Sequence, residues 1–226
     1  MMTLGGHHYH FLCLCLKKKI ALLKKIEGLK INPIILAELD IVAKRLEDSG
    51  WVIEEPKAPN FQEAAKFQAT LWLGEFRRTG GEAIKKENDP DSNFIYSQMS
   101  RRCPDTSLEK FMDSLQQRAR ISREWNKFFD QHPIILCPIT GDIPFPDLKD
   151  LESEESFDLV FDSMLPQIAP PYMGLPGLSF ATSQTKQKIP LGVQFISRKF
   201  REDLLLSIGY DLEKYYPKIE PVLPNF

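Results

Sequence analysis

The stretch "GLPGLSFATSQTKQKIPLGVQF", residues 174–195, contains two short apolar runs on either side of a polar turn. The runs "LSFA" and "LGVQF" have the length and composition of strands. Gly192 inside the second run indicates a bulge or a close backbone contact, because glycine leaves space that any other side chain would fill. We therefore predict two strands of one sheet joined by an exposed turn. An ordinary hairpin at a domain edge is the alternative for this stretch taken alone.

The sequence before and after this stretch alternates between strand and helix patterns. Short apolar runs predict strands at 19–23, 51–55 and 133–138. Apolar residues that recur every three or four positions predict helices at 33–49, 60–78, 106–129 and 200–215. Continuous apolar strands between helices favour a sheet that is covered on both faces. The expected fold class is therefore α/β, with a mixed sheet that joins residues 51–55, 134–137 and 191–195 and has helices on both faces.

Capping residues predict where the helices begin and end. The first helix has an N-cap at Asn32 and a stop signal at Gly50. Two capping boxes begin the next helices, namely Asn60 with Glu63 and Thr106 with Glu109. The third helix is expected to bury one apolar face, formed by Leu108, Phe111, Met112, Leu115, Ala119, Trp125, Phe128 and Phe129. The polar residues 80–106 predict a long loop, and residues 141–158 predict a solvated excursion.

Composition excludes several classes of function. The 226 residues carry a formal net charge of -2, so no overall field attracts nucleic acid or acidic lipid. No apolar run approaches the ~18 residues that a membrane helix needs, and no signal peptide is recognisable. The four cysteines, Cys13, Cys15, Cys103 and Cys137, are scattered, which is typical of free thiols in a reducing compartment. We expect a cytoplasmic protein without a nucleic-acid or membrane partner.

The N-terminal residues differ from the rest of the chain. Three of the four histidines and two of the cysteines lie in "HHYHFLCLC", residues 7–15. Imidazole and thiolate are zinc and copper ligands, but no second Cys/His cluster exists to complete a tetrahedral site. We expect residues 1–18 to be a ragged or disordered end, with no metal and no other cofactor.

Residues 174–214 resemble the closing segment of the amidase signature family. That segment has a Gly-x-Pro-x-x-Ser strand, a polar turn, a Pro-x-Gly-x-Gln strand and an acidic helix ending in Leu-Glu. The matching positions are Gly174, Pro176, Ser179, Pro190, Gly192, Gln194, Glu202, Leu205 and Glu213. Upstream, "RARISREWNKFFDQHPIILCP" and "INPIILAELDIVAKRLEDSGWVIEEPKAP" resemble earlier helix and strand segments of the family. The resemblance identifies residues 19–226 as the C-terminal portion of an amidase domain, similar to the bacterial branch that includes aminohexanoate cyclic-dimer hydrolases.

The resemblance also implies which part of the family is missing. Family members hydrolyse amides with a lysine and two serines that lie in a Gly/Ser-rich run in the first half of a longer chain. The 226 residues contain no Ser-Ser pair, and neither Gly5-Gly6 nor Gly80-Gly81 has a serine beside it. No catalytic residue is therefore assigned. We expect a fragment that is inactive alone, because loss of the nucleophile in a triad enzyme costs about a millionfold in rate.

Other nucleophiles are weak candidates. Cys137 lies five residues after His132, but it ends an apolar strand and is expected to be a buried, unreactive thiol. Ser179 and Ser183 have no Gly-x-Ser-x-Gly elbow to activate them. Neither the Cys137–His132 pair nor the two serines predict a reaction centre within this sequence.

In the family, the segment before the Gly-x-Pro strand lines the substrate pocket. The resemblance thus implies a pocket position near the acyl group for Ile168, Pro170, Tyr172, Met173 and Gly174. The sequence departs from its relatives here, with "APPYMG" where an asparagine is common and Ala181 where a proline is common. These departures leave the acyl specificity open.

Three interpretations remain open. The first is the C-terminal part of an amidase, which would take a small-molecule amide once an N-terminal half completes it. The second is a non-catalytic α/β binding module or subunit that complements a separate N-terminal half. The third is a plain α/β domain. A sheet cut in the middle leaves an unpaired edge strand, so we also expect a homodimer or a partner subunit.

Overall fold

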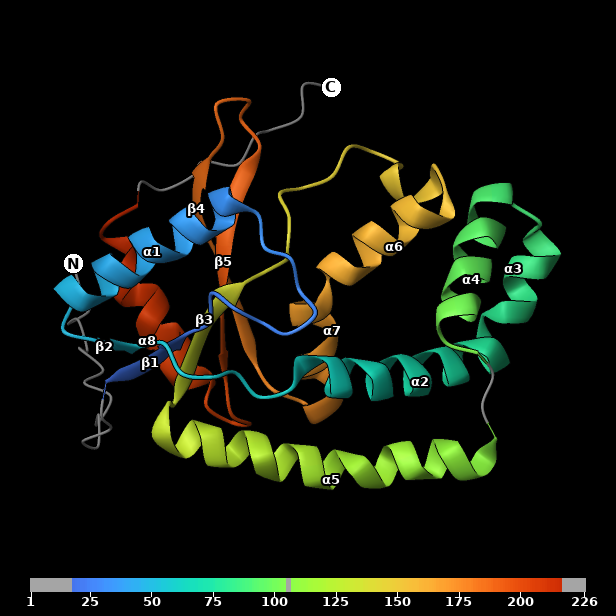
Figure 1. Cartoon of the computed structure of the whole chain (residues 1–226), viewed down its shortest axis with the longest axis horizontal. Helices are drawn as coiled ribbons and strands as arrows, with labels where there is room; N and C mark the ends of the chain where they lie inside the picture. Colours follow the sequence, from blue (N-terminus) through green and yellow to red (C-terminus); the bar gives the residue numbers. More distant parts are fainter. Residues whose placement is uncertain (1–17, 105–106, 217–226) are drawn as a thin grey trace, which may run out of the picture.

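The computed structural model describes residues 18–104 and 107–216, and within them a five-stranded mixed sheet forms the centre (Figure 1). The strand order is β2-β1-β3-β5-β4. The strands are β1 (Lys19–Leu22), β2 (Val52–Glu54), β3 (Ile134–Pro138), β4 (Gly177–Gln184) and β5 (Pro190–Ser197). β1 pairs in parallel with β2 and β3, whereas β5 runs antiparallel to β3 and β4. The predicted mixed sheet is confirmed.

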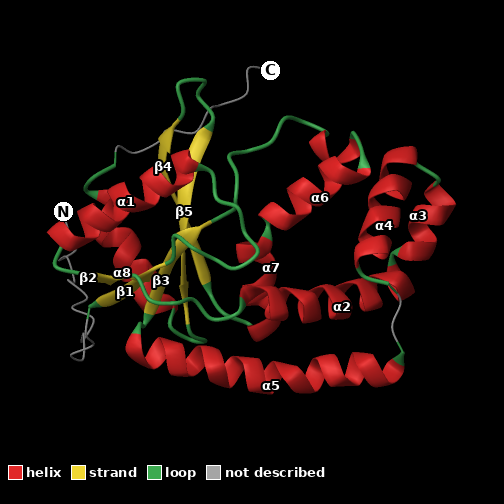
Figure 2. Ribbon diagram, viewed as in Figure 1, coloured by secondary structure: helices red, strands yellow, loops and turns green. Residues whose placement is uncertain are grey.

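Helices cover both faces of this sheet (Figure 2). On one face, α1 (Pro33–Asp48) and α8 (Glu202–Glu213) pack on Ile20, Leu136 and Phe195. On the other face, α2 (Phe61–Thr79), α5 (Leu108–Gln131) and α7 (Leu165–Met173) pack on Ala21, Ile135 and Ile196. Successive residues of β1, β3 and β5 therefore contribute to opposite cores, which explains the continuous apolar runs in the sequence.

Several predicted helix ends are confirmed. The Asn32 side chain accepts a hydrogen bond from the backbone N–H of Ile34 at 3.0 Å and caps α1. The Asn60 side chain accepts one from the N–H of Glu63 at 2.9 Å and caps α2. The Glu63 carboxylate binds the guanidinium of Arg120 on α5. Glu63 thus links two helices in addition to its place in the first turn.

The predicted long loop at 80–106 is wrong. It contains α3 (Gly81–Glu87) and α4 (Pro90–Arg102). Asn88 has a positive φ of 56° and ends α3, and the Asp89 carboxylate accepts from the N–H of Ser92 at 2.8 Å to begin α4. The "NDPDSN" motif is thus a helix start with a proline in the first turn. Because α4 buries none of its residues, it lacks the apolar periodicity that predicts a helix.

The prediction for residues 141–158 is wrong over its last part. After a short 3-10 turn at Lys149–Leu151, α6 (Glu154–Ser163) begins within the segment. The Ser153 hydroxyl accepts from the N–H of Ser156, and Glu154 and Glu155 occupy the first turn. Acidic residues stabilise the N-terminus of a helix, so the acidic composition here indicates a helix start as well as exposure.

The predicted helix at 106–129 is confirmed as α5, but only part of its predicted buried face is buried. The cap is Ser107, whose hydroxyl accepts from the N–H of Lys110, and Thr106 lies outside the described residues. Trp125 and Phe129 are buried as expected. The predicted buried residues Leu108, Met112, Leu115 and Ala119 are instead exposed, because no element in the described ranges covers that side of the helix.

The prediction of two strands of one sheet joined by a turn at residues 174–195 is confirmed, and so is the close backbone contact predicted at Gly192. A Cβ atom at Gly192 would lie 2.8 Å from the carbonyl oxygen of Phe180, and the register shifts between Ala181 and Ser183. β4 lies at the edge of the sheet, and in the described part of the chain only β5 pairs with it. The expected ragged end at 1–18 falls, except for Lys18, outside the described residues.

Candidate functional site

A cleft of about 330 Å³ lies at the carboxyl end of β3, the central strand. Ligands of open α/β sheets bind beyond the carboxyl ends of the parallel strands, so this is the expected place for a site. The loop after β3, the start of β5 and the helices α6 and α7 form its walls. The lining is mostly apolar, and its polar side chains are Thr140, Asp142, Ser163 and Gln167.

Hydrogen bonds fix the loop that follows β3. The Asn32 amide donates to the Asp142 carboxylate at 2.6 Å, while its oxygen caps α1. The N–H of Asn32 donates to the carbonyl of Gly141 at 2.8 Å, and the N–H of Gly141 donates to the carbonyl of Ser163 at 2.8 Å. The cap of α1 therefore also holds the wall of the cleft against α6.

Gly141 is required at this position by the space around it. A Cβ atom there would lie 2.5 Å from the carbonyl oxygen of Lys30 and 2.8 Å from a methyl group of Leu29. Contacts below 3.0 Å to a backbone oxygen force the chain to move. The glycine thus permits the close approach of the loop to the segment before α1.

The Pro-x-Gly-x-Gln strand contributes to the cleft in two ways. Pro190 and Gly192 lie in its wall. Gln194 is outside the lining, and its buried amide donates to the carbonyl of Pro166 in α7 at 3.2 Å. One strand thus provides the cleft surface and positions the helix that faces it.

The five predicted pocket residues occupy different environments. Ile168 lines a separate depression of about 430 Å³ next to α2 and α4. Pro170, Tyr172 and Met173 are buried, and Tyr172 stacks on Phe67 with ring centres 5.7 Å apart and donates its hydroxyl to the carbonyl of Ser114. Gly174 is exposed and ends α7 with a φ of 65°. That these residues contact an acyl group stays a prediction.

Four residues that the sequence analysis did not assign to a pocket line the cleft. Met164 and Gln167 come from the α6–α7 junction, and Thr140 and Asp142 come from the loop after β3. The available signal was position: polar residues directly after a buried parallel strand lie at the ligand-binding edge of the sheet. The sequence did not predict helix α7, because Pro170 and Pro171 lie within it and proline is disfavoured inside helices.

The cleft can bind and orient a ligand. Apolar walls with a few polar groups are typical of small-molecule pockets. The Thr140 hydroxyl donates to the Asp142 carbonyl and the Ser163 hydroxyl donates to the Val160 carbonyl, so each hydroxyl is bonded to the backbone rather than to a base. The described residues that line the cleft include no histidine, cysteine or lysine. These residues lack the pair of nucleophile and base that covalent catalysis requires.

Two of the nucleophile candidates from the sequence, Cys137 and Ser183, have contacts typical of structural residues. Cys137 is fully buried in β3, and this burial raises the pKa of its thiol far above the usual range. His132 lies before β3 and its Nε2 contacts the Glu54 carboxylate at 2.8 Å. Ser183 donates to the Glu38 carboxylate at 2.8 Å. Among the described residues, no three His, Cys, Asp or Glu side chains could hold a metal ion, and the N-terminal Cys/His cluster lies outside them.

The comparisons with known proteins give the family. The sequence profile of the family described as Amidase matches residues 15–206, and the chain therefore belongs to the amidase family. Indoleacetamide hydrolase from Bradyrhizobium diazoefficiens is 26% identical over 196 residues, which are 86% of this chain and 37% of that protein. The A subunit of glutamyl-tRNA(Gln) amidotransferase from Desulforapulum autotrophicum is 32% identical over 108 residues, 48% of this chain and 21% of that protein.

Solved structures show the same fold. 6-Aminohexanoate cyclic dimer hydrolase superimposes with a TM-score of 0.71 at 15% identity and matches 88% of this chain and 45% of that one. The A subunit of glutamyl-tRNA(Gln) amidotransferase from Thermotoga maritima gives a TM-score of 0.61 at 22% identity, with 89% and 43% covered. The chain thus spans less than half the length of these relatives. In the described ranges, none of the helices has both the length and the apolar character needed to cross a bilayer.

Proposed function

We propose that this chain forms the C-terminal, substrate-binding part of an amide hydrolase, and that the catalytic lysine and serines come from polypeptide outside these 226 residues. The observation that carries the proposal is the cleft at the carboxyl end of β3. It is bordered by Pro190 and Gly192, which match the family motif, and the described residues of its lining include no pair of nucleophile and base.

Two features support a missing portion. The sequence has no Ser-Ser pair, and relatives such as indoleacetamide hydrolase are more than twice as long as the matched segment. The edge strand β4 is eight residues long, and alternate residues such as Ser179 and Ala181 are exposed. An exposed edge strand is a site where another strand can pair. The absent portion would extend the sheet at this edge.

The proposed substrate is a small, largely apolar amide. The cleft walls contain Ile139, Ile143 and Leu191, and Gln167 supplies an exposed amide at the rim. Indoleacetamide is the suitable first probe, because the name of one relative specifies it. The proposed location is a reducing compartment such as the cytoplasm, supported by the free thiols Cys103 and Cys137.

An activity assay tests the catalytic half of the proposal. Purified chain is incubated with indoleacetamide and ammonia release is measured. We expect no release above the buffer rate, since the loss of a nucleophile removes about a millionfold of rate enhancement. Turnover that persists after repeated purification and is lost on substitution of a residue in this chain would refute the proposal.

A binding assay tests the cleft. Saturation-transfer NMR with indoleacetamide should give a signal with the native chain. Val160→Trp fills the cleft from α6 and should abolish the signal. The neighbouring Leu159 is exposed and lies outside the lining, so Leu159→Trp is the matched control and should leave binding unchanged. Equal signals from both variants would place binding elsewhere.

A non-catalytic binding subunit is the second candidate. It is favoured by the helices on both sheet faces, which give two buried cores within this chain alone. The name of the amidotransferase relative specifies a subunit, which supports a partner polypeptide for that protein. A single cooperative melt of the isolated chain would favour this candidate, and aggregation on purification would favour an incomplete domain.

A further inference from the structure

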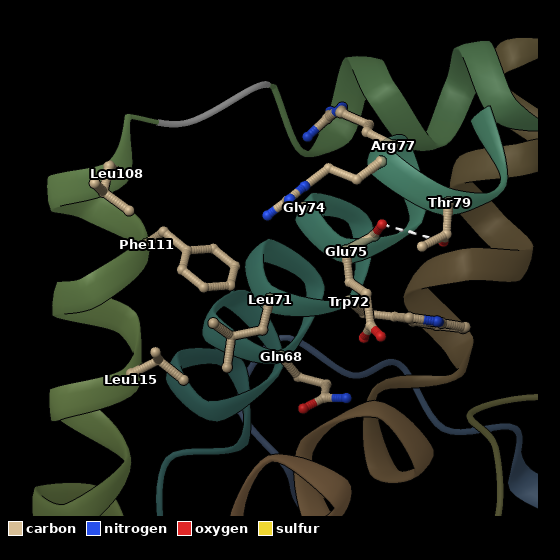
Figure 3. Close-up of a pocket in the computed structure, with 11 residues that line it drawn as sticks. Gln68, Leu71, Trp72, Gly74, Glu75, Arg77, Thr79, Leu108, Phe111 and Leu115 are labelled. Atoms are coloured by element: carbon tan, nitrogen blue, oxygen red, sulfur yellow. Dashed lines mark hydrogen bonds between the residues drawn. The ribbon is translucent and has the colours of Figure 1, made fainter. Parts of the chain in front are cut away.

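Among the hollows on the described part of the chain, one extends the cleft. The groove between α2 and α5, where Phe111 and Leu115 are directed toward Leu71 (Figure 3), shares no lining residue with the cleft. A depression of about 670 Å³ lies between the loop after β3 and the turn that joins β4 to β5. We call it the outer pocket; the residues that it shares with the cleft are Asp142, Ile143, Pro144, Phe145 and Pro190. A ligand in the cleft can therefore extend into the outer pocket.

The outer pocket has apolar walls and two charged side chains. Its apolar residues are Ile143, Pro144, Phe145, Pro146, Ile189 and Pro190. Asp142 lies where the pocket meets the cleft, and its carboxylate accepts from the Asn32 side chain at 2.6 Å and from the N–H of Ile143 at 2.8 Å. Lys188 lies in the outer pocket and outside the cleft lining. It is exposed and forms no ion pair with any residue in the described ranges.

Hydrogen bonds hold Lys188 in a backbone conformation that a lysine disfavours. The Thr185 carbonyl accepts from the N–H of Lys188 at 2.9 Å, and the Thr185 hydroxyl accepts from the N–H of Ile189 at 3.1 Å. Lys188 has a φ of 63°, and glycine is preferred at this position of a three-residue hairpin turn. The fold therefore does not account for a lysine here, and strained residues of this kind often lie at functional sites.

We propose that Lys188 binds a carboxylate at the outer end of the ligand, so that the cleft takes amides that also carry an acid group. This inference rests on the proposed function, because it assumes that the amide occupies the cleft. Asp142 repels a ligand carboxylate at the junction, and Lys188 attracts one in the outer pocket. Complementary charges of this kind set orientation and specificity. They place the amide in the cleft, the apolar chain of the ligand along Phe145 and its carboxylate at Lys188.

Two probes of equal chain length test this specificity. Hexanamide ends in a methyl group, and adipamate has a carboxylate in its place. Dissociation constants of both for the full chain are measured by saturation-transfer NMR titration at low ionic strength. Adipamate should bind about threefold more tightly than hexanamide, the advantage expected from one solvent-exposed ion pair. This advantage should disappear in 1 M NaCl, because salt screens exposed charges.

Substitutions on the turn assign the effect to one side chain. Lys188→Gly should bind both probes equally and should melt at or above the temperature of the native chain, because glycine relieves the strain at this position. Lys188→Glu should reverse the preference and bind hexanamide more tightly. Lys186 is exposed on the same turn and lies outside both linings, so Lys186→Gln is the matched control and should keep the advantage of adipamate.

The outcomes separate this inference from the proposed function. Equal affinities of the native chain for the two probes overturn the inference and leave the proposed function in place. An advantage of adipamate that Lys188→Gly retains, or that Lys186→Gln loses, also overturns the inference alone. If neither probe binds the native chain, the cleft is not an amide site, and the proposed function fails together with the inference.

Discussion

The two halves of α5 have the same kind of apolar pattern in the sequence but differ in burial. In the C-terminal half, Trp125 and Phe129 are buried against the sheet and α2, with the Trp125 ring 4.8 Å from that of Phe61. In the N-terminal half, Leu108, Met112 and Leu115 are exposed. The sheet ends before it reaches these turns, and the facing helix α2 covers only one side of them. Helical periodicity thus identifies an apolar face but not the element that covers it.

The largest expected effect is a contrast within α5 itself. Trp125→Ala should lower the free energy of unfolding by about 3–5 kcal/mol, because it leaves a large cavity in a closed core. Leu115→Ala should lower it by less than about 1 kcal/mol when measured on the monomer, since its side chain is already half in water. Urea unfolding of both variants gives the comparison. Equal losses would show that the first half of α5 is covered in solution.

Substitutions in the loop after β3 should lower stability, as they should in the buried half of α5. Gly141→Ala forces a Cβ atom against the Lys30 carbonyl, and the resulting shift should cost about 1–3 kcal/mol. Gly177→Ala is the control, because its nearest neighbour would be 3.7 Å away, an ordinary contact. The difference in urea midpoint between the two variants measures how tightly the loop is held. A neutral Gly141→Ala would mean that the cleft wall is free to move.

One hydrogen bond anchors the exposed half of α5 to the core. The Tyr172 hydroxyl donates to the carbonyl of Ser114, three residues after Phe111. Tyr172→Phe should cost about 0.5–1.5 kcal/mol, the usual net value of such a bond. Hydrogen exchange should accelerate in residues 108–116 and remain unchanged in residues 121–131. Uniform acceleration along the helix would contradict the division into two halves.

The smallest effect concerns the anchored end of α5, where His132 is the C-cap. The Glu54 carboxylate binds Lys19 and His132. Both hydrogen bonds hold the pKa of Glu54 below its ordinary value of 4.5, and the bond from Lys19 has the larger effect. A carboxyl group whose pKa is lowered in the folded state stabilises the fold fully when the pH is above the ordinary pKa. The contribution is lost as the pH falls through the folded-state pKa.

Thermal melts at pH 7, 5, 4 and 3 measure this dependence. Glu54→Gln should melt below the native chain at pH 7 and 5, and the two curves should converge by pH 3. Glu124, at the outer surface of α5 and about half exposed, provides the control variant Glu124→Gln. A difference between native and Glu54→Gln chains that stays constant down to pH 3 would assign the effect to packing.

Most of the layered fold follows from local sequence, and the candidate site follows only in part. Strands such as β3 and β5 are recognisable because each is an apolar run with a proline at one end or both. Helix α4 is not, because it buries no residue and its start signal at Asp89 and Pro90 is also a turn signal. In the cleft, Gly192 is predictable from its place within a strand. Asp142 is not, because the side chain that binds it, Asn32, lies 110 positions earlier.

The sequence by itself determined the family, the strand-turn-strand motif of residues 174–195 and the ends of α1 and α2. These depend on contacts between near neighbours, such as the bond from the Glu63 N–H to Asn60. The tertiary structure alone decided which apolar faces are covered and which loop residues meet in a cleft. Both depend on segments far apart in the chain, since burial requires a partner surface and local periodicity contains no information about where that surface lies.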